Sequence, residues 1–562
     1  MSLLLPGARR RPLRSIARMD PVANLREEIR TAAAELAPGA RPPTLERPPD
    51  PDLGDYSTNA AMLLAPAVGR PPREIAAGLR DRLADRLVGA ARIEVAGPGF
   101  LNLFLDDGWH RRAIATILAA GERFGAGSAA GGERVLLEFV SANPTGPLHV
   151  GSGRHAAYGD ALGRILGFRG DRVEREYYLN DAGGQVEAFA RSVAARMRGS
   201  EPPADGYPGE YVIELARELA AEGASAEDLD DLGRRATEAM RRRIEGTLER
   251  FRVRYGSWFS ERSLRDAGAI GDAIEALRAT GRVYERDGAV WLRTSELGDE
   301  KDRVLVRSDG EPTYFAVDIA YHRDKLARHP DRLIDPLGSD HHGYVPRLRA
   351  ALAMLGFDPN RFAAPIMQFV HLVDEGERAQ MSKRSGEFVS LDELIDDIGV
   401  DAARFLMLQR SHDKAVDLDL GLARRQSQDN PVYYVQYAHA RIASILRRAA
   451  EARGSGDLAE TAAAAAAEPA LATAAEPSER ALVRRVLELP GEVAGAAERL
   501  APHRLCAYAM AVAADFHAFY RDCRVLGAGP GLEEARLGVC LAARRAIATT
   551  LTLLGVSAPE RM

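Results

Sequence analysis

Residues 141–154, SANPTGPLHVGSGR, form a segment rich in glycine and proline between two segments that look regular. The continuous apolar run RVLLEFV precedes it at 134–140 and is typical of a buried parallel strand. An amphipathic stretch follows to about Leu166, and a second strand-like segment, DRVEREYYLND, begins at residue 171. This order predicts a βαβ unit with a right-handed crossover. Such units bind phosphate where the first strand ends and the helix begins, so the segment predicts a nucleotide-binding turn.

The residue types in this turn suit a bulky anion. Gly151 and Gly153 let the backbone approach closely, and His149 can donate a hydrogen bond to a phosphate. Ser141 and Asn143 are expected to face the same crevice. Each feature also has an ordinary structural interpretation, because Gly-Pro turns before helices are common and a lone histidine is usually structural.

A second pattern, QMSKRSGEFVSLDEL, lies at residues 380–394. Hydroxyl groups flank Lys383 and Arg384, and Gly386 can act as a hinge, which suits a loop that closes on a triphosphate. An exposed charged loop is the alternative. The pairing of this pattern with the PLHVG turn more than 200 residues earlier favours the nucleotide site.

Bulk composition limits the class of protein. The 562 residues are 46% hydrophobic and 28% charged, which is ordinary for a globular chain of three or four domains. No window reaches the roughly 20 apolar residues of a membrane span, and we expect a cytoplasmic protein without membrane contact. The net charge of -6 argues against a uniformly basic nucleic-acid binder. Three cysteines without close spacing predict neither a disulfide framework nor a zinc site.

Several motifs together resemble a known family. HVGS is similar to the HIGH signature and QMSKR to the KMSKS signature of class I aminoacyl-tRNA synthetases. The segments EFVSANPTGPLHVG, YYLNDAGGQ, GSDHHGYVPRL, VDAARFLML and FYRDCRVL resemble bacterial arginyl-tRNA synthetases in particular, from about residue 20 to the C-terminus.

The resemblance implies a multidomain α/β plus all-α fold. Residues 19–110 would form an N-terminal α+β module for the tRNA elbow around the D loop, and residues 125–395 a Rossmann-type catalytic domain with a helical insertion around 185–250. Residues 396–562 would form a helical DALR anticodon-binding domain with an Ala-rich connection at 454–480. Residues 1–18 are either a basic, disordered extension or lie before a true start at Met19.

The resemblance also implies the reaction. ATP and L-arginine would form arginyl-adenylate and pyrophosphate, and tRNA(Arg) would take the arginyl group on its terminal adenosine. Mg²⁺ would accompany ATP, no protein-bound metal is expected, and we expect a monomer. The implied catalytic residues are His149, Gly151, Ser152 and Lys383. The implied ATP-binding residues are Pro144, His149, Gly151, Gly338, Asp340, His342, Met381, Ser382, Lys383 and Arg384.

Arginine recognition requires a carboxylate that can pair with a planar guanidinium. Tyr314 and Asp318, four residues apart, would share one face of a helical turn and match the family's positions for this group. The full set implied for arginine is Ser141, Asn143, Glu261, Tyr314, Asp318 and His341. Read without the resemblance, the pair His341–His342 after Asp340 suggests a metal site or a structural turn, but the two side chains project differently and a third ligand is not obvious.

Two positions depart from the family signatures. Ser152 replaces the second histidine of HIGH, and Gln380 replaces the first lysine of KMSKS. Lys383 retains the lysine credited with transition-state charge, and Arg384 or His155 are candidates to compensate. The departures motivate one alternative, a degenerate paralogue that binds tRNA without catalysis. Two others are weaker: a cysteinyl synthetase lacks its zinc cysteines here, and a small nucleotidyltransferase would leave the terminal domains unexplained.

RNA contacts are expected on several helices. Arginines in EAMRRRIEGTLERFRVR, ASILRRAAEAR and ALVRRVLEL are candidates for phosphate binding, although most would be solvated faces. Aromatic neighbours that could stack on bases are Tyr433, Tyr434, Tyr437, Phe519 and Tyr520.

Overall fold

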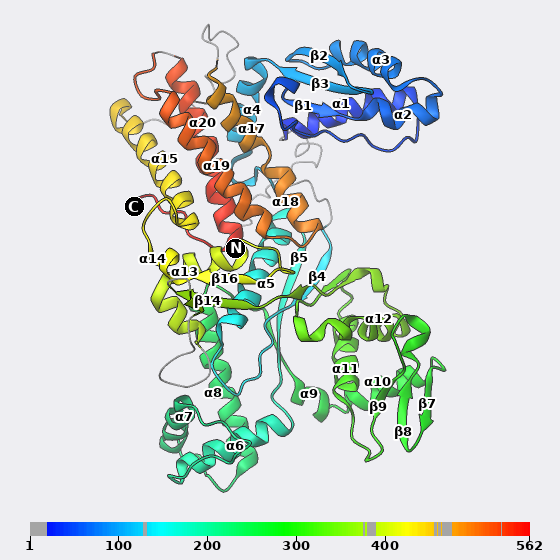
Figure 1. The fold of residues 1–562 in the computed structure, drawn as a ribbon. Helices are drawn as coiled ribbons and strands as arrows, with labels where there is room; N and C mark the ends of the chain where they lie inside the picture. The colour runs from blue at the N-terminus through cyan, green and yellow to red at the C-terminus, as the bar shows by residue number, and fades with distance from the viewer. Residues whose placement is uncertain are drawn as a thin grey trace, which may run out of the picture.

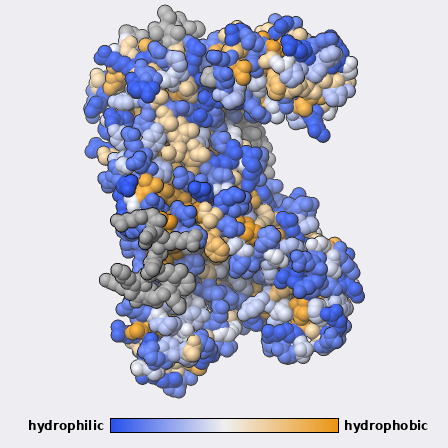
Figure 2. All heavy atoms as spheres, viewed as in Figure 1, coloured by the Kyte–Doolittle hydropathy of each residue, from blue (hydrophilic) through white to orange (hydrophobic). Residues whose placement is uncertain are grey.

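The computed structural model describes residues 20–126, 132–374, 377–378, 389–454, 458, 462, 475–529 and 531–562. Figure 1 shows an N-terminal module that stands apart from the rest, a helical bundle formed by the C-terminal half, and a central sheet from which two further lobes project. In the space-filling view, one side of the molecule is hollowed between the N-terminal module and the lobe that carries β7–β9 (Figure 2).

The N-terminal module packs helices on a small antiparallel sheet in the order β1-β3-β2. Its elements are α1 (Pro21–Leu36), β1 (Tyr56–Thr58), α2 (Ala60–Val68), α3 (Pro72–Ala84), β2 (Ala90–Ala96) and β3 (Phe100–Leu105). The alternating residues of ARIEVAGPGFLNLFL predict a hairpin around Gly97, Pro98 and Gly99, and the antiparallel pairing of β2 and β3 confirms it. Gly97 and Gly99 both take positive φ in its turn. Helix α4 (Asp107–Ala120) then packs against α17 (Pro477–Leu487) and α20 (Leu532–Leu554).

The central sheet has five parallel strands in the order β12-β10-β4-β5-β6. They are β4 (Arg134–Glu138), β5 (Arg172–Leu179), β6 (Ser257–Ser260), β10 (Arg332–Ile334) and β12 (Phe362–Ala363). Helix α5 (Val150–Arg169) connects β4 to β5, which confirms the predicted βαβ unit. The short strands β11 (Leu337–Gly338) and β13 (Ile366–Met367) pair beside it.

Two insertions extend from this sheet. The first is a helical lobe with its own apolar core, formed by α6 (Gly184–Met197), α7 (Glu210–Ala221) and α8 (Leu229–Arg250). The second comprises α9 (Glu261–Asp266), α10 (Ala269–Arg278), β7 (Val283–Arg286), β8 (Ala289–Leu292), β9 (Arg303–Val306), α11 (Tyr314–Ala327) and α12 (Val345–Met354). The sequence RVLVRSDGEPTYFAVDIAY, residues 303–321, is strand-like throughout, but it forms a strand only in β9. Its second half is helix, because the Thr313 side chain caps α11 by accepting from the Ala316 N–H.

The C-terminal half is a helical bundle with one short strand. After α13 (Leu391–Leu408), strand β16 (Val416–Asp419) pairs parallel with β14 (Val370–Asp374), and β15 (Glu377–Arg378) borders the latter. The remaining helices are α14 (Leu420–Arg424), α15 (Pro431–Arg453), α17, α18 (Leu489–Glu498), α19 (His503–Asp522) and α20. Within the described residues, α20 alone is long and apolar enough to cross a membrane, which the sequence did not predict. It packs against α15 and α19, and 67% of its most apolar window is buried, as in the core helix of a bundle.

A buried ionic cluster joins the sheet to the bundle. Asp160 of α5 accepts hydrogen bonds from Arg164 (2.7 Å), Arg175 (2.9 Å) and Arg404 (2.5 Å). Arg404, in the VDAARFL motif of α13, is fully buried and also donates to the carbonyls of Phe251 (2.8 Å) and Leu554 (3.0 Å). One side chain therefore links α5, α13 and the last turn of α20. We name this set of contacts the Asp160 cluster.

Candidate active site

A cavity of about 810 Å³ opens where β4 ends and α5 begins. The turn after β4 and the first turn of α5 form one wall, and β14 with residues 367–369 before it forms another. The predicted residues among its lining are His149, Gly151, Ser152, Gly338, Asp340 and His341. The volume falls in the range of small-molecule sites, and the position is that predicted for a nucleotide.

The backbone of the turn is strained at its start. Val140 and Ser141 have φ of +70° and +44°, a left-handed conformation that costs a non-glycine residue roughly 1–3 kcal/mol. Side chains hold it in place: the Ser141 hydroxyl donates to Glu138 (2.8 Å) and accepts from the Tyr178 N–H (3.1 Å). The Tyr177 hydroxyl donates to the carbonyl of Ala142 at 2.9 Å. Backbone strain that several hydrogen-bonding partners hold in place is typical of a functional turn.

His149 is the N-cap residue of α5. Its Nδ1 accepts the Ser152 N–H at 3.2 Å, so the proton of the neutral ring lies on Nε2, which is 3.4 Å from the Ser152 hydroxyl. Burial lowers the pKa of His149, so the ring is neutral at pH 7 and Nε2 is a hydrogen-bond donor. Ser152 at the second histidine position therefore supports the first histidine.

Glycine is required at the two positions of HVGSG for different structural reasons. A Cβ at Gly151 would lie 2.8 Å from Cε1 of His149, so glycine leaves room for that ring at the start of the helix. A Cβ at Gly153 would lie 2.7 Å from Leu391 and 3.2 Å from Met407, both on α13. The expectation that Gly153 permits approach to an anion is therefore wrong, because Gly153 permits close packing of α5 against α13.

His155 does not restore the charge lost at the altered signatures. It lines the cavity, and burial together with the neighbouring Arg154 lowers its pKa to about 4. The ring is therefore neutral at physiological pH. The Arg154 guanidinium is itself buried and donates to four backbone carbonyls, including those of Gln368 (2.7 Å) and Ser411 (2.9 Å). Arg154 therefore connects α5 by hydrogen bonds to the segment that precedes β14.

The second signature lies outside the described residues, and this includes Gln380, Met381, Ser382, Lys383 and Arg384. The described chain on both sides borders the cavity, through Leu372 on β14 and through Val389. The Val150 N–H donates to the carbonyl of Val389 (3.2 Å), and the Leu391 N–H donates to that of Leu148 (2.8 Å). The chain that leaves this segment is therefore attached to the first turn of α5.

The remaining residues predicted for ATP divide into two groups. Gly338 and Asp340 line the cavity, together with His341, which was predicted for arginine and whose Nε2 lies 3.5 Å from the Asp340 carboxylate. Pro144 is buried within the turn and His342 is exposed, and neither belongs to the cavity wall. Within the described chain, no group of three His, Cys, Asp or Glu side chains is placed to hold a metal ion.

Three of the residues predicted for arginine, Glu261, Tyr314 and Asp318, lie on the second insertion. Tyr314 begins α11 and is 79% exposed, and Asp318 follows one turn later and accepts a hydrogen bond from the Tyr344 hydroxyl. Glu261 begins α9, is buried, and accepts from Tyr178 (3.0 Å). Arg265 also donates to Glu261, through two nitrogens at 3.0 and 2.7 Å. Glu261 thus already binds a guanidinium of the chain.

Tyr178 brings the two carboxylates together. Burial, followed by the negative charges of Glu261 and Asp318, raises the pKa of Tyr178, so both carboxylates act on one phenol. Tyr178 lies in the segment YYLND and Tyr344 in GSDHHGYV. Neither segment indicates by itself that these hydroxyls contact the carboxylates of Glu261 and Asp318. Asn143 is exposed and donates to Gln185 at 2.6 Å, beside the strained turn.

Comparison with known proteins gives consistent matches along the chain. Three family models match: the arginyl tRNA synthetase N terminal domain over residues 23–105, the catalytic domain of class I (R) tRNA synthetases over 217–430, and the DALR anticodon binding domain over 435–562. Among curated relatives, the arginine–tRNA ligase of Desulforudis audaxviator is 47% identical over 536 residues, 93% of this chain and 94% of that protein.

Other relatives agree. The arginine–tRNA ligase of Heliobacterium modesticaldum is 44% identical over 567 residues, covering 97% of this chain and all of that protein. Among solved structures, the arginyl-tRNA synthetase of Thermus thermophilus matches with a TM-score of 0.74 at 27% identity, covering 96% of this chain and 99% of that one.

Proposed function

Since the chain belongs to the arginyl-tRNA synthetase family and ligates arginine to tRNA, we propose that the cavity at the start of α5 binds ATP. In this proposal Asp318 and Tyr314 bind the guanidinium of arginine, and Glu261 joins them once the substrate displaces Arg265. Ser141 and Asn143 face the other end of the amino acid. The observation that carries this proposal is the position of His149, the N-cap of α5, beside a cavity at the carboxyl end of β4. Helix N-termini in this position bind phosphate through free N–H groups.

The chemistry needs no protein nucleophile. An oxygen of the arginine carboxylate attacks the α-phosphorus of ATP, a new P–O bond forms, and the bond to the pyrophosphate oxygen breaks. The enzyme must position the reactants and stabilise the charge that develops on the departing pyrophosphate. The Nε2–H of His149 and the N–H of Gly151 are the donors that face this charge, because the N–H groups of Val150 and Ser152 already donate to Val389 and to His149 Nδ1. Synthetases of this kind generally use ATP with Mg²⁺, which would accompany the phosphates of ATP.

Amino-acid-dependent exchange of pyrophosphate into ATP tests this function. We expect exchange with arginine and none with lysine, cysteine or glutamate, because only a guanidinium can fill a bidentate carboxylate site. Each amino acid is assayed with and without tRNA. Exchange that appears only with tRNA shows that activation waits for the RNA, whereas exchange without tRNA rejects that requirement. A folded protein that binds tRNA but exchanges with no amino acid contradicts the site assignment.

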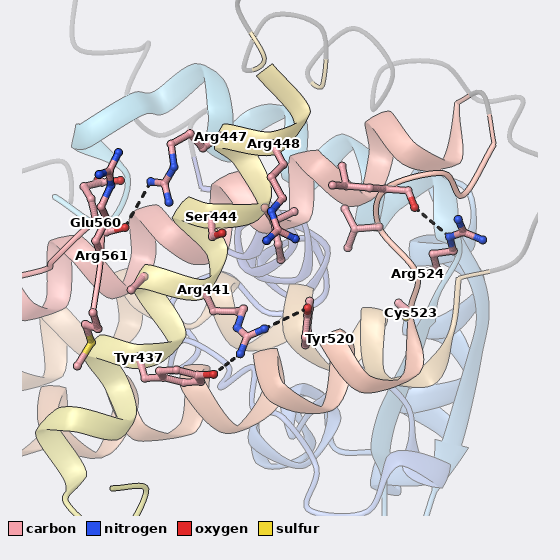
Figure 3. A pocket seen from close by; sticks show the side chains of 15 residues that line it. Tyr437, Arg441, Ser444, Arg447, Arg448, Tyr520, Cys523, Arg524, Glu560 and Arg561 are labelled. Carbon is pink, nitrogen blue, oxygen red and sulfur yellow. Dashed lines mark hydrogen bonds between the residues drawn. The ribbon is translucent and has the colours of Figure 1, made fainter. Parts of the chain in front are cut away.

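The C-terminal bundle contains a second cavity of about 680 Å³ with an arginine-rich wall (Figure 3). Arg441 lies between two rings, with its Cζ 5.1 Å from the centre of Tyr437 and 5.2 Å from that of Tyr520. It donates a hydrogen bond to each of the two hydroxyls. Arg447 and Arg448, from the predicted ASILRR segment, line the same cavity. We assign this cavity to bases and phosphates of the anticodon loop, because aromatic faces and arginines are the groups that bind unpaired RNA.

The predicted aromatic residues do not all belong to this site. Tyr437 and Tyr520 line the cavity, and Tyr433 stacks on Tyr437 with 6.2 Å between ring centres. Tyr434 packs on His517 at 4.9 Å. Phe519 is fully buried in the bundle core, so the prediction that it stacks on RNA is wrong.

We expect Tyr437→Ala to raise the KM for tRNA about tenfold or more, since loss of one stacked base costs roughly 1–3 kcal/mol. The KM for arginine at saturating tRNA should not change, because the site is on another domain. Arg521→Ala is the matched control: its side chain is 73% exposed on α19 and pairs only with Asp522 among the contacts described. An unchanged tRNA KM in the tyrosine variant would place the RNA contact elsewhere.

A further inference from the structure

The proposed arginine site is assembled from elements that are distant in sequence. Ser141 and Asn143 lie on the turn after β4, whereas Tyr314 and Asp318 lie on α11. The distance between these two parts sets the length of amino acid that can span them. Lys325, on the same helix as Asp318, is fully buried beneath both parts.

Lys325 contacts two adjacent strands of the central sheet. Its Nζ lies 2.5 Å from Oε2 of Glu138, the last residue of β4, and 3.0 Å from Oδ2 of Asp335, the residue that follows β10. β4 and β10 pair in parallel, so the two carboxylates lie at the same edge of the sheet. The ammonium therefore attaches α11 to the edge at which the cavity opens.

One branch of this network leads into the strained turn. Glu138 uses its other oxygen, Oε1, to accept from the Ser141 hydroxyl at 2.8 Å. Ser141 in turn accepts from the N–H of Tyr178, whose hydroxyl donates to Glu261. The carboxylate that Lys325 binds is thus the partner that holds the left-handed conformation of Ser141.

The other branch leads to Asp318. His322 Nε2 lies 3.0 Å from the Asp335 carboxylate, and its Nδ1 lies 2.9 Å from the backbone carbonyl of Asp318. Asp318, His322 and Lys325 are spaced by four and three residues and so share one face of α11. The turn of α11 that carries Asp318 is therefore bound through Asp335 to the end of β10, next to β4.

We propose that Lys325 is a positioning residue that fixes the spacing between the Ser141 turn and Asp318, and thereby selects amino acids with the side-chain length of arginine. The inference rests on the proposed arginine site. A buried ion cluster is often replaced by apolar residues without loss of stability, so stability alone does not account for two carboxylates and an ammonium at this place. The connection of these three groups to both parts of the site does account for their presence here.

The test uses Lys325→Met and a second variant, K325M/E138Q/D335N. The single variant leaves two buried carboxylates without a cation and could fail to fold, whereas the triple variant leaves no unpaired buried charge. Aminoacylation is measured with arginine and with its homologues one methylene shorter and one longer, and the KM for ATP is measured in parallel. We expect the KM for arginine to rise about tenfold and the preference for arginine over the homologues to fall by about the same factor. The KM for ATP should stay within about twofold, since His149 is held by other contacts.

Arg303→Met is the matched control. Arg303 pairs with the buried Asp299 through two 2.7 Å contacts in the same insertion, and neither residue contacts the proposed site. It should lower the melting temperature without changing the KM for arginine or the preference among homologues. The proposal is overturned if both Lys325 variants retain the wild-type preference, or if the KM values for arginine and ATP rise equally. If Asp318→Asn has no effect in the otherwise wild-type chain, the arginine site itself is misplaced, which separates that failure from this one.

Discussion

The Asp318→Asn variant is expected to lose about 100- to 1,000-fold in kcat/KM for arginine. Asparagine has nearly the same size and still offers an oxygen to the Tyr344 hydroxyl, so the local structure should persist. The change removes only the negative charge opposite the guanidinium. Leaving a desolvated charge without its partner costs about 3–5 kcal/mol, and each 1.4 kcal/mol is a factor of ten. Steady-state aminoacylation with varied arginine measures the effect.

Citrulline gives this prediction a second readout, because it has the shape of arginine without the charge. The preference for arginine over citrulline as a competing ligand should fall in Asp318→Asn. Asp324→Asn is the control, since Asp324 is on the same helix, is 43% exposed and pairs with Arg328. It should retain wild-type kcat/KM. A wild-type value in Asp318→Asn would assign guanidinium binding to Glu261 or to another acid.

The second large effect is expected on stability. Arg404→Met should cost about 3–5 kcal/mol, because it leaves the buried carbonyls of Phe251 and Leu554 without a donor and removes one of the charges that neutralise Asp160. We expect a lower midpoint of thermal unfolding, followed by circular dichroism, and faster proteolysis between α13 and the bundle. Loss of contacts at the last turn of α20 should expose that connection first.

Arg424→Met is the matched control for this variant. Arg424 pairs with Asp374 and Asp397 but is 43% exposed, and surface ion pairs contribute about 0–1 kcal/mol. Its unfolding midpoint should remain close to that of the wild type. An equal decrease of the unfolding midpoint in the two variants would show that the buried ion pairs of the Asp160 cluster stabilise the fold no more than exposed ion pairs do.

The sequence predicted the features that depend on local pattern. The β4–α5–β5 unit followed from an apolar run, a turn rich in glycine and proline, and an amphipathic stretch, all contiguous. The hairpin at residues 97–99 and the helical spacing of Tyr314 and Asp318 had the same basis. These patterns depend only on residues close in sequence, and the elements that they predict are retained in the folded structure.

Contacts between distant segments were not predictable in this way. Lys325 meets Glu138 across 187 positions of the chain, and Tyr344 meets Asp318 across 26. No periodicity specifies such partners, because they depend on which strands lie side by side. The role of Gly153 was misjudged for the same reason, since its neighbours Leu391 and Met407 belong to a helix more than 200 residues away.

The Asp160 cluster also lies on the connection between the two proposed binding sites. The cavity at α5 and the arginine-rich cavity of the bundle are connected through packed helices and a buried arginine. If these cavities bind ATP and the anticodon loop as proposed, this connection would set the distance between them. A tRNA whose acceptor end and anticodon are the wrong distance apart would then fill one cavity but not both, and the RNA would be selected by its overall dimensions in addition to its bases.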